Sequence, residues 1–355
     1  MRTRPRTGAM GPLDAKHSPV DNARMHTFIN SRFCTRFGLT TPVALAPMAL
    51  ASGGALASAC ARAGALGLVG GGYGDLAWTQ REYQLALQAA DTGRIGCGFI
   101  TWKLDEDASA LDWVLDRPPV QRPRALMLSF GDPRPYARRI ADSGAALICQ
   151  VQRMDQVPQA IEAGAQVIVA QGAEAGGHGM NALNGRSTMT FVPELADWLS
   201  AHSPTTLLLA AGGIADGRTL AAALVLGADG ALVGSRLWAT QESLAPLGAK
   251  DMAVATDGDG TARTAVFDIL RRKNWPAPYD FRALRNALHR QWEDRIDALR
   301  ADPGTARAAY DEGVRSGNFE AAHATAGEAV GLIHDLPTAG ALVQRMDAQA
   351  RALLG

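Results

Sequence analysis

The feature that most constrains this chain is a series of eight short apolar runs, most of which end near a Gly or Pro. Most of the runs start about 20 to 30 residues apart, the spacing that a strand, a loop and a crossover helix require. The runs cover residues 43–48, 66–70, 95–101, 125–129, 146–151, 166–170, 206–211 and 230–234. Helical periodicity lies between them, for example in residues 54–63 and 218–226. We therefore predict an α/β fold in which eight β/α units close into a TIM (β/α)8 barrel.

A doubly wound open sheet is the alternative fold for such a rhythm. A sheet of that kind usually carries a GxGxxG dinucleotide fingerprint after its first strand. Here residues 49–54 read Ala-Leu-Ala-Ser-Gly-Gly, and the glycines of residues 70–74 also lack the required spacing. The barrel is therefore the favoured fold.

The rhythm divides the chain into four regions. Residues 1–28 contain Pro, Arg, Ser and Asp without periodicity, so we expect a disordered leader, with a transit peptide as the alternative. The barrel is expected over residues 29–240. Residues 241–325 contain helical patterns such as 281–299, and they are predicted to form a small helical second domain, or lid, after strand eight. Residues 326–355 end in an amphipathic stretch, which we expect to be a helix that returns to the barrel.

Composition argues against several classes of partner. The chain has 35 Lys and Arg and 35 Asp and Glu, so it lacks the basic excess typical of proteins that bind nucleic acid or anionic membranes. Residues 43–61 carry no charge but are largely Ala, Ser and Gly, which is too weakly apolar for a membrane span, and a secretory signal is not expected. The cysteines have no paired or metal-binding spacing, so we expect reduced thiols in the cytoplasm and no metal site.

Two glycine turns follow the seventh and eighth predicted strands, where TIM barrels usually bind phosphate. Both turns open onto predicted helices. A glycine N–H approaches an anion closely, and a helix N-terminus adds about half a positive charge. We therefore predict a phosphate site in these turns, with the hydroxyl of Ser235 as a further donor. Its residues are Gly212, Gly213, Leu232, Val233, Gly234 and Ser235.

A histidine follows the sixth predicted strand, where residues 171–179 read Gln-Gly-Ala-Glu-Ala-Gly-Gly-His-Gly. Flanked by glycines at the mouth of a barrel, His178 can approach a flat ligand closely, and a pKa of about 6.5 suits it to accept a proton near neutral pH. His178 is therefore a candidate catalytic residue, although a surface-loop histidine without a role is the default interpretation for a lone histidine. Glu174 is a candidate to orient it, although a solvated or helix-capping carboxylate is the more common role.

Two other side chains suit a flat polar ring at the same mouth. Met48 follows Pro47 after the first predicted strand and can form an apolar wall, although a core methionine is the default interpretation. Gln171 offers two donors and an acceptor to the edge of a heterocycle. Gln150 and Gln152, at the end of the fifth predicted strand, have the same chemistry.

Taken together, these segments resemble the nitronate monooxygenase family, formerly called 2-nitropropane dioxygenases. The resemblance is carried by residues 42–48, 171–179, 211–217 and 227–236, and it resumes at 327–333. The Glu-Ala-Gly-Gly-His motif is the most specific part, whereas the other segments are shared more widely among FMN barrels.

The resemblance implies a TIM barrel with a small helical domain and non-covalently bound FMN. It also implies that His178 is catalytic and that a phosphate cradle lies at residues 232–235. The implied cofactor contacts outside the cradle are Met48, Gln171, Gly176, Gly177, Gly212 and Gly213.

The implied reaction is the oxidation of an alkyl nitronate by FMN and dioxygen to a carbonyl compound and nitrite. If a neutral nitroalkane is also a substrate, His178 is the expected base for its α-proton. The expected partners are a small-molecule substrate and dioxygen, and the oligomeric state is left open. The alternative on the same fold is an FMN-dependent reductase that takes hydride from NAD(P)H and passes it to a quinone or an enoyl-thioester. A flavin-binding protein without turnover and a flavin-free phosphate barrel are two further alternatives.

Overall fold

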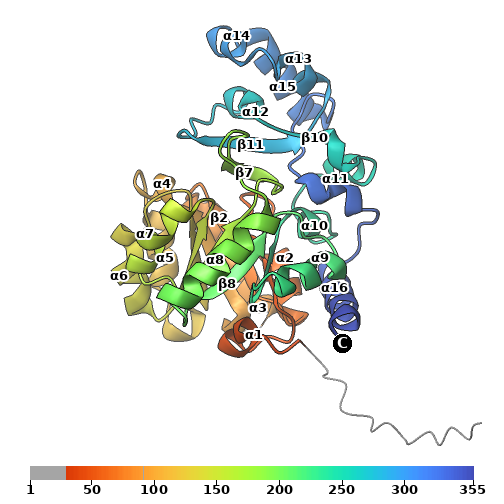
Figure 1. Ribbon diagram of the computed structural model, residues 1–355. Coiled ribbons are helices and arrows are strands. Elements are labelled where there is room, and N and C mark those ends of the chain that lie inside the picture. The colour runs from red at the N-terminus through yellow and green to blue at the C-terminus, as the bar shows by residue number, and fades with distance from the viewer. Residues whose placement is uncertain (1–28, 91) are drawn as a thin grey trace, which may run out of the picture.

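The computed structural model describes residues 29–90 and 92–355, and its centre is a ring of eight parallel strands (Figure 1). The strands are β1 Val43–Leu45, β2 Gly67–Gly72, β3 Ile95–Ile100, β4 Ala125–Ser129, β5 Ala146–Val151, β6 Val167–Gln171, β8 Leu207–Ala211 and β9 Gly230–Val233. Strand β9 pairs with β1. The N–H of Leu66 donates to the carbonyl of Val43, and the carbonyl of Leu66 accepts from the N–H of Leu45, so β2 is joined to β1 and the ring closes. The predicted TIM barrel and its eight strands are confirmed, whereas the predicted leader, residues 1–28, lies outside the described residues.

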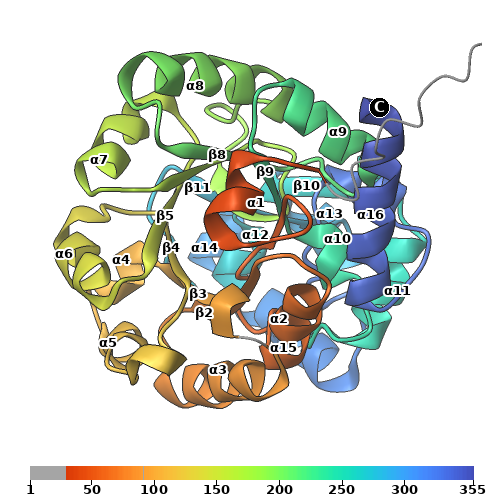
Figure 2. The same cartoon turned by 90° about the horizontal axis from the view of Figure 1, so that it is seen from below.

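Side chains alternate along each barrel strand between the interior of the barrel and the surrounding helices. In β4, for example, Met127 packs in the interior and Leu126 packs against the helices, and both are buried. Helix α1, Arg32–Phe37, closes the amino end of the barrel, because its Phe33 and Phe37 belong to the interior cluster. Figure 2, seen from below, shows α1 across the centre of the ring. The opposite, carboxyl end of the strands is thereby left for a site.

Helices surround the barrel, as the periodicity between the strands predicted. The main ones are α2 Gly54–Arg62, α3 Leu76–Ala89, α5 Ser109–Leu115, α6 Arg134–Ser143, α7 Val157–Glu162, α8 Thr188–His202 and α9 Gly217–Val225. Short helices α4, Thr101–Leu104, and α10, Ser235–Trp238, follow β3 and β9. The last helix, α16, Ala339–Leu354, packs against α9 and α2, and its Val343 and Met346 are fully buried.

Residues 241–325, which we call the lid, lie over the carboxyl end of the barrel strands (Figure 1). The lid helices are α11 Leu247–Val254, α12 Val266–Leu270, α13 Ala287–Trp292, α14 Ile296–Ala301 and α15 Gly304–Ser316. Two lid strands, β10 Thr261–Thr264 and β11 Tyr279–Leu284, join β7, Gly177–Met180, in a three-stranded antiparallel sheet. Because β7 comes from the loop after β6, this sheet ties the lid to the barrel.

One expectation about the lid was wrong. Residues 281–299 were predicted to be helical, but they begin within β11 and continue through two separate short helices. In β11, Tyr279, Phe281 and Ala283 alternate with polar residues, which is a strand pattern of period two. The division of the chain at residues 240 and 325 remains a prediction.

Within the described residues, no helix combines the length and the apolar character needed to cross a membrane.

Candidate functional site

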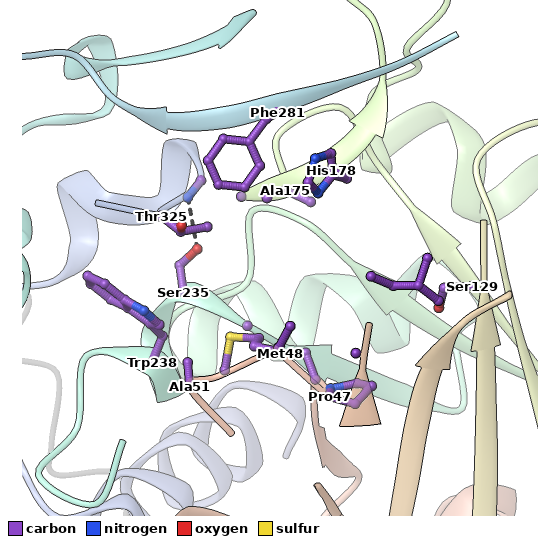
Figure 3. Close-up of a pocket in the computed structure, with 18 of the residues that line it drawn as sticks. Pro47, Met48, Ala51, Ser129, Ala175, His178, Ser235, Trp238, Phe281 and Thr325 are labelled. Carbon is purple, nitrogen blue, oxygen red and sulfur yellow. Dashed lines mark hydrogen bonds between the residues drawn. The ribbon is translucent and has the colours of Figure 1, made fainter. Parts of the chain in front are cut away.

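A cavity of about 560 Å³ lies between the carboxyl ends of the barrel strands and the lid. Its walls come from the loops after most barrel strands and from lid residues around α12 and α15. Figure 3 shows His178 and Phe281 on one side of the cavity and Pro47 and Met48 on the opposite side. We call the space between these two walls the slot.

The structure brings the predicted site residues to this one cavity, with one exception. The residues that line it are Met48, Gln171, Gly176, Gly177, His178, Gly212, Gly213, Leu232, Gly234 and Ser235. The exception is Val233, which does not line the cavity, because its side chain points to the helix side of the sheet and is only 1% exposed. The alternation of side chains along β9 explains this difference from Leu232.

Gly213 and Gly234, in the turns after β8 and β9, have no tightly packed neighbour at the cavity. A Cβ atom added to Gly234 would meet nothing closer than 3.8 Å, and one added to Gly213 would meet nothing closer than 4.0 Å. Gly213 has a φ of 76°, which favours glycine. Within residues 29–90 and 92–355, the N–H groups of Gly213 and Gly234 donate to no protein acceptor. The turns therefore offer backbone donors to an anion.

Ser235 joins these turns to the segment that follows the lid. Its Oγ accepts a hydrogen bond of 2.8 Å from the N–H of Gly327, as the dashed line in Figure 3 marks. Since the hydroxyl acts as the acceptor in this bond, its own proton remains free to be donated. Ser235 lines the cavity, so a bound anion is one acceptor for that proton.

Gln171 is held in a fixed orientation at the end of β6. Its Oε1 accepts from the side-chain amides of Gln150, at 3.1 Å, and Gln152, at 2.9 Å. Its Nε2 donates to the carbonyl of His178 at 3.1 Å. The three glutamines that the sequence singled out therefore form one network, and this network anchors the main chain of the catalytic candidate.

His178 lies on β7, and its imidazole contacts the lid. Nε2 lies 3.0 Å from both carboxylate oxygens of Asp268 in α12. The ring stacks on Trp275, with centroids 3.4 Å apart and planes at 11°, and it lies 4.7 Å from the ring of Phe281. Its side chain is 8% exposed and that of Asp268 is 7% exposed.

Burial controls the charge of this imidazole. Loss of water around the ring lowers the pKa of His178 to about 4, although the hydrogen bond to Asp268 opposes this shift. Arg271 and Arg263 add to the lowering because their positive charges disfavour a second cation. The imidazole is therefore neutral near pH 7, and a neutral imidazole can accept a proton.

Arg263 on β10 supports the loop that carries His178. Its guanidinium donates to the carbonyls of Ala175, at 2.6 Å, and Gly177, at 3.1 Å. It also donates to the carbonyl of Asp280 at 2.7 Å, so one side chain joins the loop to β11. Burial lowers the pKa of this arginine to about 9.

Glu174 does not orient His178. Its carboxylate accepts from the N–H and hydroxyl of Thr188 and from the hydroxyl of Ser187, all within 3.1 Å. Ser187 is the N-cap of α8, so Glu174 satisfies donors at a helix N-terminus. The helix-capping role, which was expected as the more common role of such a carboxylate, is confirmed.

Three residues of the site were not predicted from the sequence: Asp268, Trp275 and Arg263. All three belong to the lid, about 90 residues after His178, and no local spacing connects them to it. A signal was present for Asp268, which interrupts the apolar stretch Val-Phe-Asp-Ile-Leu of α12. A carboxylate on an apolar helix is rarely buried without a partner, so such a residue is a site candidate.

The chain matches the family model described as nitronate monooxygenase over residues 106–348. Among curated relatives, a nitronate monooxygenase of Metarhizium robertsii is 34% identical over 87% of this chain and 90% of its own length. A nitronate monooxygenase of Neurospora crassa is 30% identical over 92% of each chain.

Two solved structures have a similar fold. FabK from Thermotoga maritima aligns with a TM-score of 0.76 and 23% identity over 92% of this chain and 97% of that one. The nitroalkane oxidase from Streptomyces ansochromogenes aligns with a TM-score of 0.73 and 24% identity over 91% of this chain and 100% of that one.

Proposed function

The chain belongs to the nitronate monooxygenase family, and on that premise we propose that it uses FMN and dioxygen to oxidise alkyl nitronates to carbonyl compounds and nitrite. Family membership makes the protein a flavin-dependent oxidoreductase. The identity of the flavin, the oxidant, the products and the site residues are parts of the proposal.

The residues present fit a flavin mononucleotide. A volume of about 560 Å³ falls within the range of ~300–1,000 Å³ that cofactor and ligand sites occupy. The slot between the walls of Pro47 and Met48 and of His178 and Phe281 suits a flat tricyclic ring. A bound flavin supplies the electron acceptor for the nitronate and the electron donor for dioxygen.

The phosphate of FMN would be held by the turns after β8 and β9. The N–H groups of Gly213 and Gly234, which have no acceptor among the described residues, and the hydroxyl proton of Ser235 are suitable donors for a dianion. Gly212 and Leu232 complete the lining beside them. Among the described residues, the nearest side-chain atoms lie 3.8 Å or more from a Cβ atom added to Gly213 or Gly234, so the two glycines leave room for an anion.

His178 would serve the substrate. As a neutral imidazole in a buried site, it can accept the α-proton of a nitroalkane, and a nitroalkane without that proton is the nitronate. The lid surrounds the imidazole with Trp275 and Phe281, and these rings exclude water from the reacting carbon. The observation that carries the proposal is this buried imidazole, which faces the apolar wall of Met48 across the slot beside a glycine cradle.

The absorption spectrum of the purified protein tests the proposal first. We expect a yellow protein that releases FMN on denaturation, whereas a colourless protein that takes up no added FMN contradicts the cofactor assignment. Anaerobic addition of an alkyl nitronate should then bleach the flavin, and admission of oxygen should restore the colour with release of nitrite. Rapid bleaching by NADH, without bleaching by a nitronate, would favour the reductase alternative.

A further inference from the structure

We propose that Asp268 is a positioning residue that holds His178 in the tautomer protonated at Nε2, so that Nδ1 is the nitrogen that accepts the α-proton of a nitroalkane. This inference rests on the proposed function for the identity of the substrate. The assignment of the tautomer itself rests only on the geometry of the two side chains.

The contacts of Nε2 determine which ring nitrogen of His178 carries the hydrogen. Nε2 lies 3.0 Å from each oxygen of Asp268, and the oxygens of a carboxylate accept hydrogen bonds. Nε2 must therefore carry the hydrogen. Within the described part of the chain, no protein group forms a hydrogen bond with Nδ1, and His178 lines the cavity. The lone pair of Nδ1 is thus the free base of the imidazole.

The ring is prevented from turning to exchange its two nitrogens. Trp275 covers it in parallel at 3.4 Å, and Phe281 packs at 4.7 Å. The main chain of His178 is held by Gln171 and pairs with Phe281 between β7 and β11. A ring flip would leave the carboxylate of Asp268 buried without a donor, which is costly in a site that excludes water.

The charges that face His178 come from several elements. Asp268 and Arg271 lie on and just after α12, Arg263 lies on β10, and His323 lies in the segment after α15. Arg271 lies 3.9 Å from Asp268, so a cation borders the carboxylate. Asp268 supplies the negative charge among these four groups.

The proposed step is a single proton transfer. The Cα–H bond of the nitroalkane breaks, its electron pair forms the C=N bond of the nitronate, and the proton goes to Nδ1 of His178. The resulting imidazolium carries a positive charge next to the carboxylate of Asp268, which stabilises it. A preformed nitronate has already lost this proton, so its oxidation does not need the step.

This difference between substrates makes Asp268→Asn informative. The asparagine keeps the shape of the side chain but removes its charge and offers a donor as well as an acceptor. We expect kcat/KM for a neutral nitroalkane to fall on the order of 10²-fold, the size of a general-base contribution, and kcat/KM for the preformed nitronate to change less than fivefold. Asp268→Glu should recover part of the nitroalkane activity. Asp297→Asn, an exposed lid carboxylate paired with Arg300, is the matched control and should change neither value.

Nitrogen-15 NMR of labelled histidine provides a test that is independent of turnover. In the flavin-loaded wild-type protein, His178 should show Nε2–H, and in Asp268→Asn an Nδ1–H population should appear and the pKa of His178 should fall. Observation of Nδ1–H in the wild-type protein overturns the proposal even if no variant folds. Equal losses on nitroalkane and nitronate also overturn it. If the wild-type protein oxidises neither substrate, the proposed function fails, whereas the NMR result still decides the role of Asp268.

Discussion

The indole of Trp275 lies flat on the imidazole of His178, with ring centroids 3.4 Å apart and an angle of 11° between the planes. The indole N–H donates to the hydroxyl of Tyr73 at 3.0 Å, so the stack is fixed from the barrel side as well. Trp275 therefore removes water from one face of the ring, and loss of water is the main cause of the low pKa of His178.

The substitution Trp275→Ala should raise the pKa of His178. Water would reach the exposed face and stabilise the imidazolium. We therefore expect the pKa of His178 to rise from about 4 toward its ordinary value by one unit or more, which corresponds to ~1.4 kcal/mol. NMR titration of the imidazole measures the change. Trp198→Ala is the matched control, because Trp198 stacks on His202 on α8 and neither residue lines the cavity. If the pKa of His178 is unchanged in Trp275→Ala, groups other than Trp275 cause its low value.

Removal of the imidazole should separate cofactor binding from turnover. His178→Ala keeps both glycine turns, so the variant should retain its yellow flavin. Nitroalkane oxidation should fall by on the order of 10²-fold or more, because the proposed general base is removed. Flavin content and initial rates measure the two effects. Activity equal to that of the wild-type protein would end the catalytic assignment of His178.

The glycine turn after β9 should be sensitive to a branched side chain. In Gly234→Val, the new Cβ meets no described protein atom closer than 3.8 Å, so it makes ordinary van der Waals contacts without a clash. We expect FMN to bind at least about tenfold more weakly, or about 1.4 kcal/mol, while the flavin-free protein keeps its melting temperature. Fluorescence titration with FMN gives the affinity.

Gly340→Val serves as the control for this substitution, since Gly340 lies on α16 and its added Cβ would also meet nothing closer than 4.0 Å. Full FMN affinity in Gly234→Val would contradict the placement of the phosphate.

The lid should lose stability in mild acid. Burial lowers the pKa of His289 to about 4 and that of His323 to about 3, below the ordinary value of 6.5. Unfolding therefore takes up protons between pH 6.5 and about 3. The stabilisation from these neutral histidines is fully present above pH 6.5 and is lost as the pH falls through this window.

Calorimetry at pH 7 and pH 5 measures this effect. We expect a lower melting temperature at pH 5, and a smaller decrease in the double variant His289→Gln, His323→Gln. His202→Gln, at an exposed position on α8, should not alter the decrease. The interpretation is wrong if the double variant shows the same pH dependence as the wild-type protein.

The eight strands were predictable because each is a local feature. A strand buried on both faces is an apolar run, such as residues 146–151, and its length and spacing are visible in the sequence. The glycine turns at Gly213 and Gly234 were predictable for a similar reason, since a barrel places all strand ends at one rim. The side-chain direction within each strand determined which of Leu232 and Val233 reaches the cavity.

The sequence by itself determined the barrel, the glycine cradle and the histidine at the rim, because strand periodicity, turn residues and motif spacing act over a few neighbouring positions. Only the tertiary structure decided the surroundings of that histidine. Asp268, Trp275 and Arg263 reach His178 because β11 pairs with β7 across about 100 residues of sequence, and such long-range pairing leaves no local pattern. The charge and tautomer of the imidazole depend on burial and on these distant partners, so they are properties of the folded site and not of the motif.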